Sequence, residues 1–121
     1  MTDLEVFQLY KEQYEAIDGK RQELADAIRQ QVPADQVSAR LKQLALGWDQ
    51  AHLNYILAGN KIFDQNNEEI QRLSGALKEA QGRIRESLED LRKVAKTLDQ
   101  ITSVVAIATS LLGLASPKVV A

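Results

Sequence analysis

An apolar residue recurs every seven positions through the second half of the chain, from Ile70 to Leu112, without interruption. A heptad spacing keeps these side chains on one stripe of an α-helix, the pattern typical of helices that pack on other helices. The residues three positions further on are also mostly apolar or small. The repeating positions are Ile70, Leu77, Ile84, Leu91, Leu98, Val105 and Leu112. This repeat predicts a long helix over about residues 67–115.

Two further helices are predicted ahead of the heptad segment. Apolar residues step by three and four along about 3–31 and again along about 34–63, as on amphipathic helices. Thr2 and Glu5 have the spacing of a capping box at the start of the first helix, and Pro33 marks the break between the two. With two prolines and six glycines in 121 residues, the chain has too few turn signals for a multistranded sheet.

We therefore expect one all-α domain over residues 1–121: an antiparallel helical hairpin plus a long third helix. Such elements form a three- or four-helix bundle with coiled-coil-like packing. An unbroken third helix would be about 70 Å long, whereas the hairpin arms would reach about 45 Å. No glycine or proline lies between Arg83 and Leu112 to turn the helix back. A break near Thr97 is the alternative, although no sequence signal marks it.

Residues with catalytic or metal-binding chemistry are sparse. The chain has no cysteine and one histidine, His52, with Asp49 one helical turn before it. Two ligands do not make a metal site, and no glycine-rich phosphate loop or recognisable nucleophile motif accompanies them. The sequence therefore predicts a protein that is not an enzyme, with no cofactor, no metal and no small-molecule substrate.

Charge is balanced along the chain, with 15 basic and 17 acidic residues. The densest basic cluster is Arg92, Lys93 and Lys96, and acidic residues flank it on both sides: Glu86, Glu89, Asp90 and Asp99. Because these carboxylates cancel the field of the cluster, the chain lacks the basic stripe that nucleic-acid binding requires. No nucleic-acid partner is expected.

The segment between Gln100 and Pro117 contains no charged residue. It is short for a membrane span, which needs about 20 apolar residues. Its polar residues form one narrow stripe, as at the solvent-exposed edge of a bundle helix or the lining of a pore helix: Thr102, Ser103, Thr109, Ser110 and Ser116. The residues expected to form an interface with protein or lipid are Leu98, Ile101, Val104, Val105, Ala108, Leu111, Leu112 and Leu114.

Two functions follow from this segment. The first is a non-enzymatic interaction or scaffold protein that binds itself, as a homo-oligomer, or another helical protein through the apolar part of the third helix. The second is a membrane-active or pore-forming α-helical protein that inserts residues 97–117. Helical hairpins with an Ala/Val/Leu/Ser-rich segment resemble components of α-helical pore-forming toxins of the haemolysin E type. No functional residue follows from that resemblance.

The N-terminal residues show no targeting pattern. Met1 to Glu5 include neither a basic region nor an apolar region of the kind found in signal peptides. We therefore expect a cytoplasmic protein, with secretion by a signal-less route or association with a membrane as the alternatives.

Overall fold

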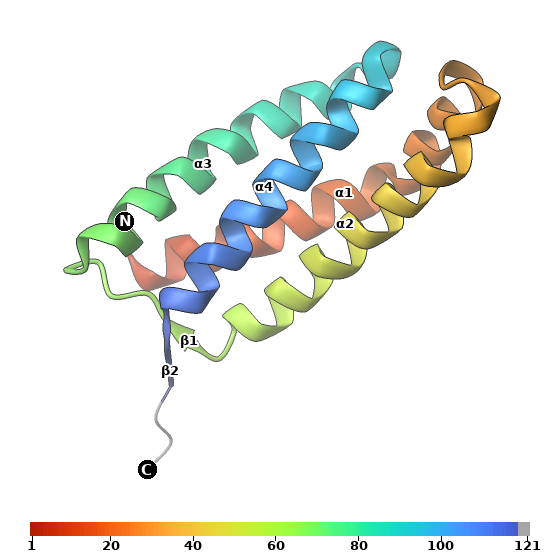
Figure 1. Ribbon diagram of the computed structural model, residues 1–121. Helices are drawn as coiled ribbons and strands as arrows, with labels where there is room; N and C mark the ends of the chain where they lie inside the picture. The colour runs from red at the N-terminus through yellow and green to blue at the C-terminus, as the bar shows by residue number, and fades with distance from the viewer. Residues whose placement is uncertain (119–121) are drawn as a thin grey trace.

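Four long α-helices form the body of the protein, as the computed structural model in Figure 1 shows for residues 1–118. Short 3-10 turns and a pair of two-residue strands connect the helices and close one end. The helices are α1 (Asp3–Gln31), α2 (Val37–Ala58), α3 (Glu68–Glu89) and α4 (Val94–Leu114). The turns are η1 (Ala34–Gln36) and η2 (Leu91–Lys93), and the strands are β1 (Lys61–Ile62) and β2 (Ser116–Pro117). The predicted all-α bundle is confirmed, in its four-helix form.

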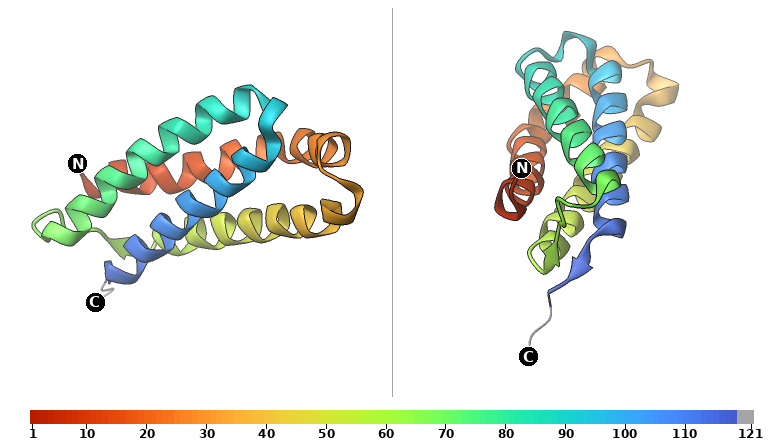
Figure 2. Two further views of the ribbon diagram at one scale, coloured as in Figure 1. Left: turned by 45° about the horizontal axis from the view of Figure 1, so that its top comes forward. Right: turned by 90° about the vertical axis from the view of Figure 1, so that its left-hand side faces the viewer.

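The helices run alternately up and down the bundle. α1 and α3 point one way, and α2 and α4 point the other way (Figure 2). α1 packs mainly on α2, α3 packs mainly on α4, and α2 and α4 lie side by side to join the two hairpins. β1 and β2 pair antiparallel, with Ile62 opposite Ser116, and this pair ties the end of α4 to the connection that follows α2.

Local side-chain caps set two of the helix starts. At α1 the Thr2 hydroxyl accepts the Glu5 N–H, and the Glu5 carboxylate accepts the Thr2 N–H, so the predicted capping box is present. At α3 the Asn67 side chain accepts the backbone N–H groups of Glu69 and Ile70, both at 3.0 Å. The Asn67 cap therefore sets the start of α3 at Glu68.

The second helix is shorter than the predicted span of 34–63. Residues 34–36 form the turn η1, and α2 ends at Ala58. The chain leaves the helix because Phe63 is drawn into the core: its ring is buried beside Tyr10, and its N–H donates to the Asp3 carboxylate at 2.7 Å. A contact with the first helix thus ends the second.

The prediction of one continuous third helix is wrong, because the chain turns back at Asp90, seven residues before Thr97. Asp90 is extended, with φ −139° and ψ 100°. Its carboxylate accepts the Arg92 N–H and pairs with the Arg92 guanidinium, which lowers the pKa of Asp90 to about 2. Gln31, at the end of α1, donates to the Leu91 carbonyl and accepts the Val94 N–H. A local cap and a tertiary contact make this turn.

The core lies along the facing stripes of all four helices. Both halves of the heptad stripe contribute to it, from Ile70 on α3 to Leu112 on α4. The Tyr10 hydroxyl crosses this core and donates to the Ala108 carbonyl at 2.6 Å. α2 and α4 approach closely at Gly47, where an added Cβ would lie 2.9 Å from the Ile101 side chain. The close approach of these two helices therefore depends on Gly47.

Candidate functional site

Seven of the eight residues predicted to form an interface lie inside the bundle. Leu114 is the exception, with 43% of its surface exposed. The seven buried residues are Leu98, Ile101, Val104, Val105, Ala108, Leu111 and Leu112. In this structure they pack against the chain's own helices, so the exposed surface of α4 is its opposite side.

The outward side of α4 carries no charge beyond Asp99. Its exposed residues are Thr102, Ser103, Ala106, Thr109, Ser110, Gly113 and Leu114. The outward side of α3 is very different, because this helix has nine exposed charged residues: Glu68, Glu69, Arg72, Lys78, Glu79, Arg83, Arg85, Glu86 and Glu89. A helix that faces water normally carries charged side chains on that face. Packing inside the bundle does not explain why α4 lacks them.

The neighbouring helix α2 exposes a row of leucines. Leu46, Leu53 and Leu57 are 59%, 48% and 41% exposed. They follow one another at steps of seven and four, which places them on one side of the helix. No Asp, Glu, Lys or Arg occurs between Gln50 and Asn60. The outward side of α2 therefore carries no charged residue after Asp49, which lies between Leu46 and Leu53.

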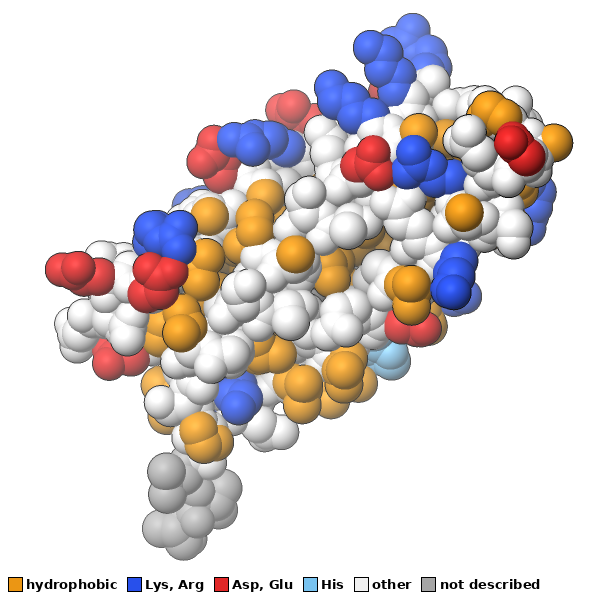
Figure 3. Space-filling model, viewed as in Figure 1, with side chains coloured by type: hydrophobic (Ala, Val, Ile, Leu, Met, Phe, Trp, Pro, Cys, Tyr) orange, Lys and Arg blue, Asp and Glu red, His pale blue; other side chains and the backbone are white. Residues whose placement is uncertain are grey.

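These two outward sides meet along the α2–α4 seam. Gln43 donates to the Thr102 hydroxyl at 2.9 Å, and Asn54 donates to the Thr109 hydroxyl at 3.0 Å, which fixes the helices side by side. Figure 3 shows orange and white atoms over this part of the molecule, with charged groups gathered towards its borders. The neutral face, as we name it, consists of Leu46, Leu53 and Leu57 of α2 with Thr102, Ala106, Thr109 and Gly113 of α4.

Charged residues mark both ends of the neutral face. The Arg40 guanidinium pairs with the Asp99 carboxylate at 2.8 Å, and Gln43 also donates to that carboxylate. These hydrogen bonds lower the pKa of Asp99. At the other end Lys118 donates from its backbone N–H to the Asn60 carbonyl and from its ammonium to the Gly59 carbonyl. The neutral face is thus a bounded surface of about three helical turns.

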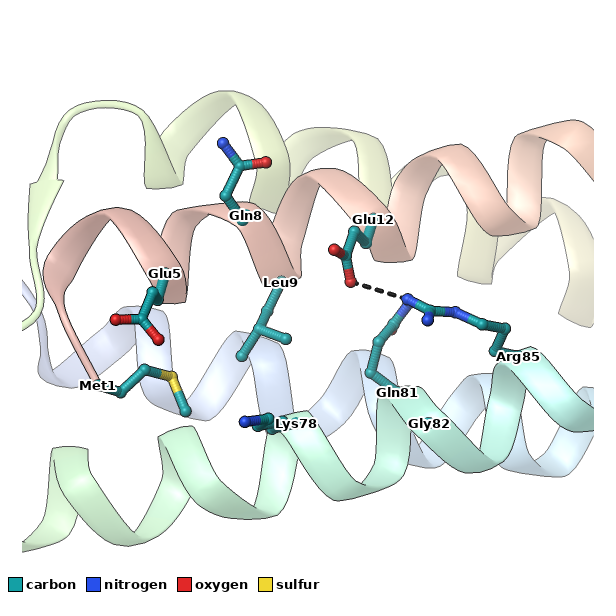
Figure 4. Close-up of a pocket in the computed structure, with 9 residues that line it drawn as sticks. All are labelled: Met1, Glu5, Gln8, Leu9, Glu12, Lys78, Gln81, Gly82 and Arg85. Carbon is teal, nitrogen blue, oxygen red and sulfur yellow. Dashed lines mark hydrogen bonds and ion pairs between the residues drawn. The ribbon is translucent and has the colours of Figure 1, made fainter.

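A hollow of about 410 Å³ lies on another side of the molecule, between α1 and α3 (Figure 4). Leu9 and the buried Gln81 line it, and an ion pair between Glu12 and Arg85 spans it at 3.0 Å. Lys78 and Glu5 add one charge of each sign. Because its charges cancel, the hollow offers no preference for an anion or a cation. No group of three metal-binding side chains occurs within residues 1–118.

The aromatic residues form the seam between α1 and α2. Tyr14 stacks on His52 with ring centroids 4.7 Å apart, and the Trp48 ring lies beside both. Arg21 covers the Trp48 ring at 4.0 Å from its centroid, and the indole N–H donates to the Asp18 carboxylate at 2.9 Å. The rings stack on one another and the indole N–H is hydrogen-bonded, so this seam has a structural role.

The sequence contained the signal for the neutral face, although sequence reasoning read only part of it. The absence of charge on α4 is evident in the sequence, but of the eight residues expected to form an interface only Leu114 is exposed in the structure. Leu46, Leu53 and Leu57 fall outside the apolar stripe of α2, and leucines off the stripe of a helix are the pattern that an exposed apolar row leaves. Comparison of the chain with protein-family models, curated proteins and solved structures finds no match.

Proposed function

We propose that this chain is a non-enzymatic interaction protein whose neutral face pairs with the neutral face of a second copy. The observation that carries the proposal is the contrast between the two sides of the bundle: α3 is densely charged outside, and the outward sides of α2 and α4 are not. Solvent-exposed apolar surface of this kind is characteristic of protein contacts. The surface of the partner that contacts the neutral face must also lack charge, because burying an unpaired charge in the interface would cost its hydration free energy.

The shape of the neutral face suits a second copy. Leu46, Leu53 and Leu57 form a ridge on α2, and Ala106 and Gly113 with the threonines form a shallow strip on α4. Under two-fold symmetry the ridge of each copy would lie on the strip of the other, as ridges pack into grooves between helices. A stable interface needs about 800 Å² of surface from each partner. The chain exposes 7102 Å² in total, so such an interface would use only a small part of its surface.

The test is the mass of the protein in solution, measured by size-exclusion chromatography with light scattering. We expect the wild type to be a dimer at micromolar concentration, and Leu53→Glu or Ala106→Glu to be monomeric with an unchanged helical signal. Gln71→Glu adds the same charge on the outward side of α3 and should leave the dimer intact. A monomeric wild type would contradict the proposal.

A specific observation also supports a membrane-active function. Leu91–Leu114 is long and apolar enough to cross a membrane, and a little under half of an 18-residue window within it is buried in the bundle. Insertion would require α4 to leave the core, because its apolar stripe now contacts the other helices. Flotation with vesicles of neutral and anionic phospholipid tests this function. A membrane-active chain should float with the vesicles, whereas a chain that only pairs with a second copy should stay in the soluble fraction.

A further inference from the structure

The heptad stripe passes through the turn between α3 and α4 without changing phase. Ile84 lies on α3, Leu91 in η2 and Leu98 on α4, each seven residues from the next. If the turn straightened, these residues would lie on one stripe of a single helix. The sequence is therefore compatible with a closed hairpin and with one long helix.

The turn itself contains no residue that stops a helix. Residues 89–93 read Glu-Asp-Leu-Arg-Lys, and no residue within 1–118 has a positive φ angle. The other junctions are different: Pro33 separates α1 from α2, and two asparagines precede α3. The Asp90 cap and the contacts with Gln31 stabilise the closed form of this turn. The balance between the two conformations thus depends on a few polar contacts.

We propose that the α3–α4 hairpin opens at residues 90–93 and that two copies of the chain exchange α4. In the exchanged dimer each α4 occupies the place in its partner that it holds in its own bundle, so every core contact of α4 is made again. Only the turn changes conformation. Straightening it adds intrahelical hydrogen bonds at residues 90–94 and removes the contacts of Asp90 and Gln31.

The occupant of the vacated place is a second copy, because nothing else restores the same contacts. An opened monomer would leave the buried side of α4 bare, and soluble monomers rarely expose so large an apolar surface. The residues concerned are Val94, Thr97, Leu98, Ile101, Val104, Val105, Ala108, Leu111 and Leu112. The polar contacts are reproduced as well, including the bond from the Tyr10 hydroxyl to the Ala108 carbonyl and the bond from Ser87 to Gln100.

The exchange is independent of the proposed pairing through the neutral face. Exchange uses the buried side of α4, and the neutral face remains on the outside of every bundle. Leu53→Glu should therefore abolish face-to-face pairing and permit exchange. All tests of exchange are made in the Leu53→Glu background for this reason, so the failure of one proposal is distinguishable from the failure of the other.

The chain has no cysteine, so pairs of single-cysteine variants report exchange directly. Ser87→Cys and Gln100→Cys lie opposite one another across the α3–α4 seam. The two variants are mixed at high concentration, warmed through the melting transition, cooled and treated with a short bismaleimide. We expect a crosslinked dimer. Glu12→Cys mixed with Arg85→Cys is the control, because that pair joins α1 to α3 within the part that does not exchange.

Variants of the turn should move the equilibrium in opposite directions. Asp90→Ala removes the cap and should raise the dimer-to-monomer ratio roughly fivefold for each of the two turns, the factor expected for one lost cap. Leu91→Pro should abolish exchange and keep the hairpin, because Asp90 already has the extended conformation that precedes a proline. Leu91→Ala is the matched control, since it loses the same packing and can still straighten.

Three results would overturn the exchange. The first is that Ser87→Cys and Gln100→Cys give no crosslinked dimer when both chains also carry Asp90→Ala. The second is that Leu91→Pro and Leu91→Ala form the same amount of crosslinked dimer. The third is binding of Asp90→Ala to phospholipid vesicles without an interchain product, which would show that the opened α4 enters lipid and not a second copy.

Discussion

Gly47 and Gly75 lie in the middle of α2 and α3, yet they have opposite surroundings. A Cβ at Gly47 would meet the buried Ile101 side chain at 2.9 Å, whereas a Cβ at Gly75 would meet nothing within 4 Å. Alanine gains about 1 kcal/mol over glycine inside a helix, and overpacking a core costs about 1–3 kcal/mol. We expect Gly75→Ala to stabilise the fold by up to about 1 kcal/mol and Gly47→Ala to destabilise it by a similar amount.

Urea unfolding of both glycine variants measures this difference. The two substitutions have the same intrinsic helix propensity, so their contrast isolates the contact between α2 and α4. If Gly47→Ala were as stabilising as Gly75→Ala, the result would contradict the claim that the Ile101 side chain leaves no room for a Cβ at residue 47.

Tyr10 provides a prediction of pH dependence. Burial raises the pKa of its hydroxyl, so the folded chain keeps a neutral phenol where an unfolded chain ionises near pH 10. This contribution to stability is complete below about pH 10 and is lost as the pH rises above that value. Tyr10→Phe removes the hydrogen bond to Ala108 and should cost about 1 kcal/mol at neutral pH.

The cost of Tyr10→Phe should shrink in alkali, because only the wild type must keep a phenol from ionising. Urea midpoints of both proteins at about pH 8 and about pH 11 give the comparison. A gap that stays constant between the two pH values would mean that Tyr10 ionises freely in the folded protein.

At the scale of the helix, α4 has two sides with different roles, and neighbouring residues distinguish them. Val105 is buried in the core and Ala106 is exposed on the neutral face. An aspartate at 105 would be desolvated without a partner, so Val105→Asp should lower the free energy of unfolding by several kcal/mol and depress the melting temperature. Ala106→Asp should leave the melting temperature of the monomer unchanged and weaken only self-association.

Thermal melting followed by far-UV circular dichroism, with the mass measured in parallel, separates these effects. If Val105→Asp yielded a stably folded monomer, the residue would belong to an interface between chains and not to the core.

The sequence predicted those helix ends that local chemistry determines. The Thr2–Glu5 capping box and the break at Pro33 are readable because each acts within a few residues. The turn at Asp90 was missed because half of it comes from Gln31, about 60 residues away in the chain. The end of α2 was missed for the same reason, since the burial of Phe63 against Tyr10 and its bond to Asp3 are long-range contacts.

Of the eight residues expected to form an interface, all but Leu114 are buried in the bundle. A heptad stripe predicts that a helix packs on another helix, but it does not say whether that helix belongs to the same chain. Once the chain turns at Asp90, Leu98 and Val105 lie in the core of their own bundle, where α4 packs mainly on α3 and α2. The remaining candidate surface then consists of residues outside the stripe, such as Leu53 and Ala106. The periodicity of the apolar residues does not identify these positions.

At the scale of the whole molecule, one core connects all four helices, and this has a measurable consequence. Trp48 is the only tryptophan, and it reports the α1–α2 seam, whereas far-UV circular dichroism reports every helix. Because the buried cluster is continuous from Val6 to Leu112, loss of one hairpin should expose the other. We expect urea unfolding of the Leu53→Glu monomer to give coincident curves by tryptophan fluorescence and circular dichroism at low micromolar concentration.

The same comparison should change when the α3–α4 hairpin is free to open. In Asp90→Ala the opened segment keeps its helical signal, because its residues remain in one long helix. The core against which Trp48 packs loses the residues of α4. The fluorescence transition should then precede the circular dichroism transition, and the gap should close at high protein concentration, where a second copy supplies α4 again. Coincident curves at every concentration in Asp90→Ala would mean that the two hairpins separate only when the whole bundle unfolds.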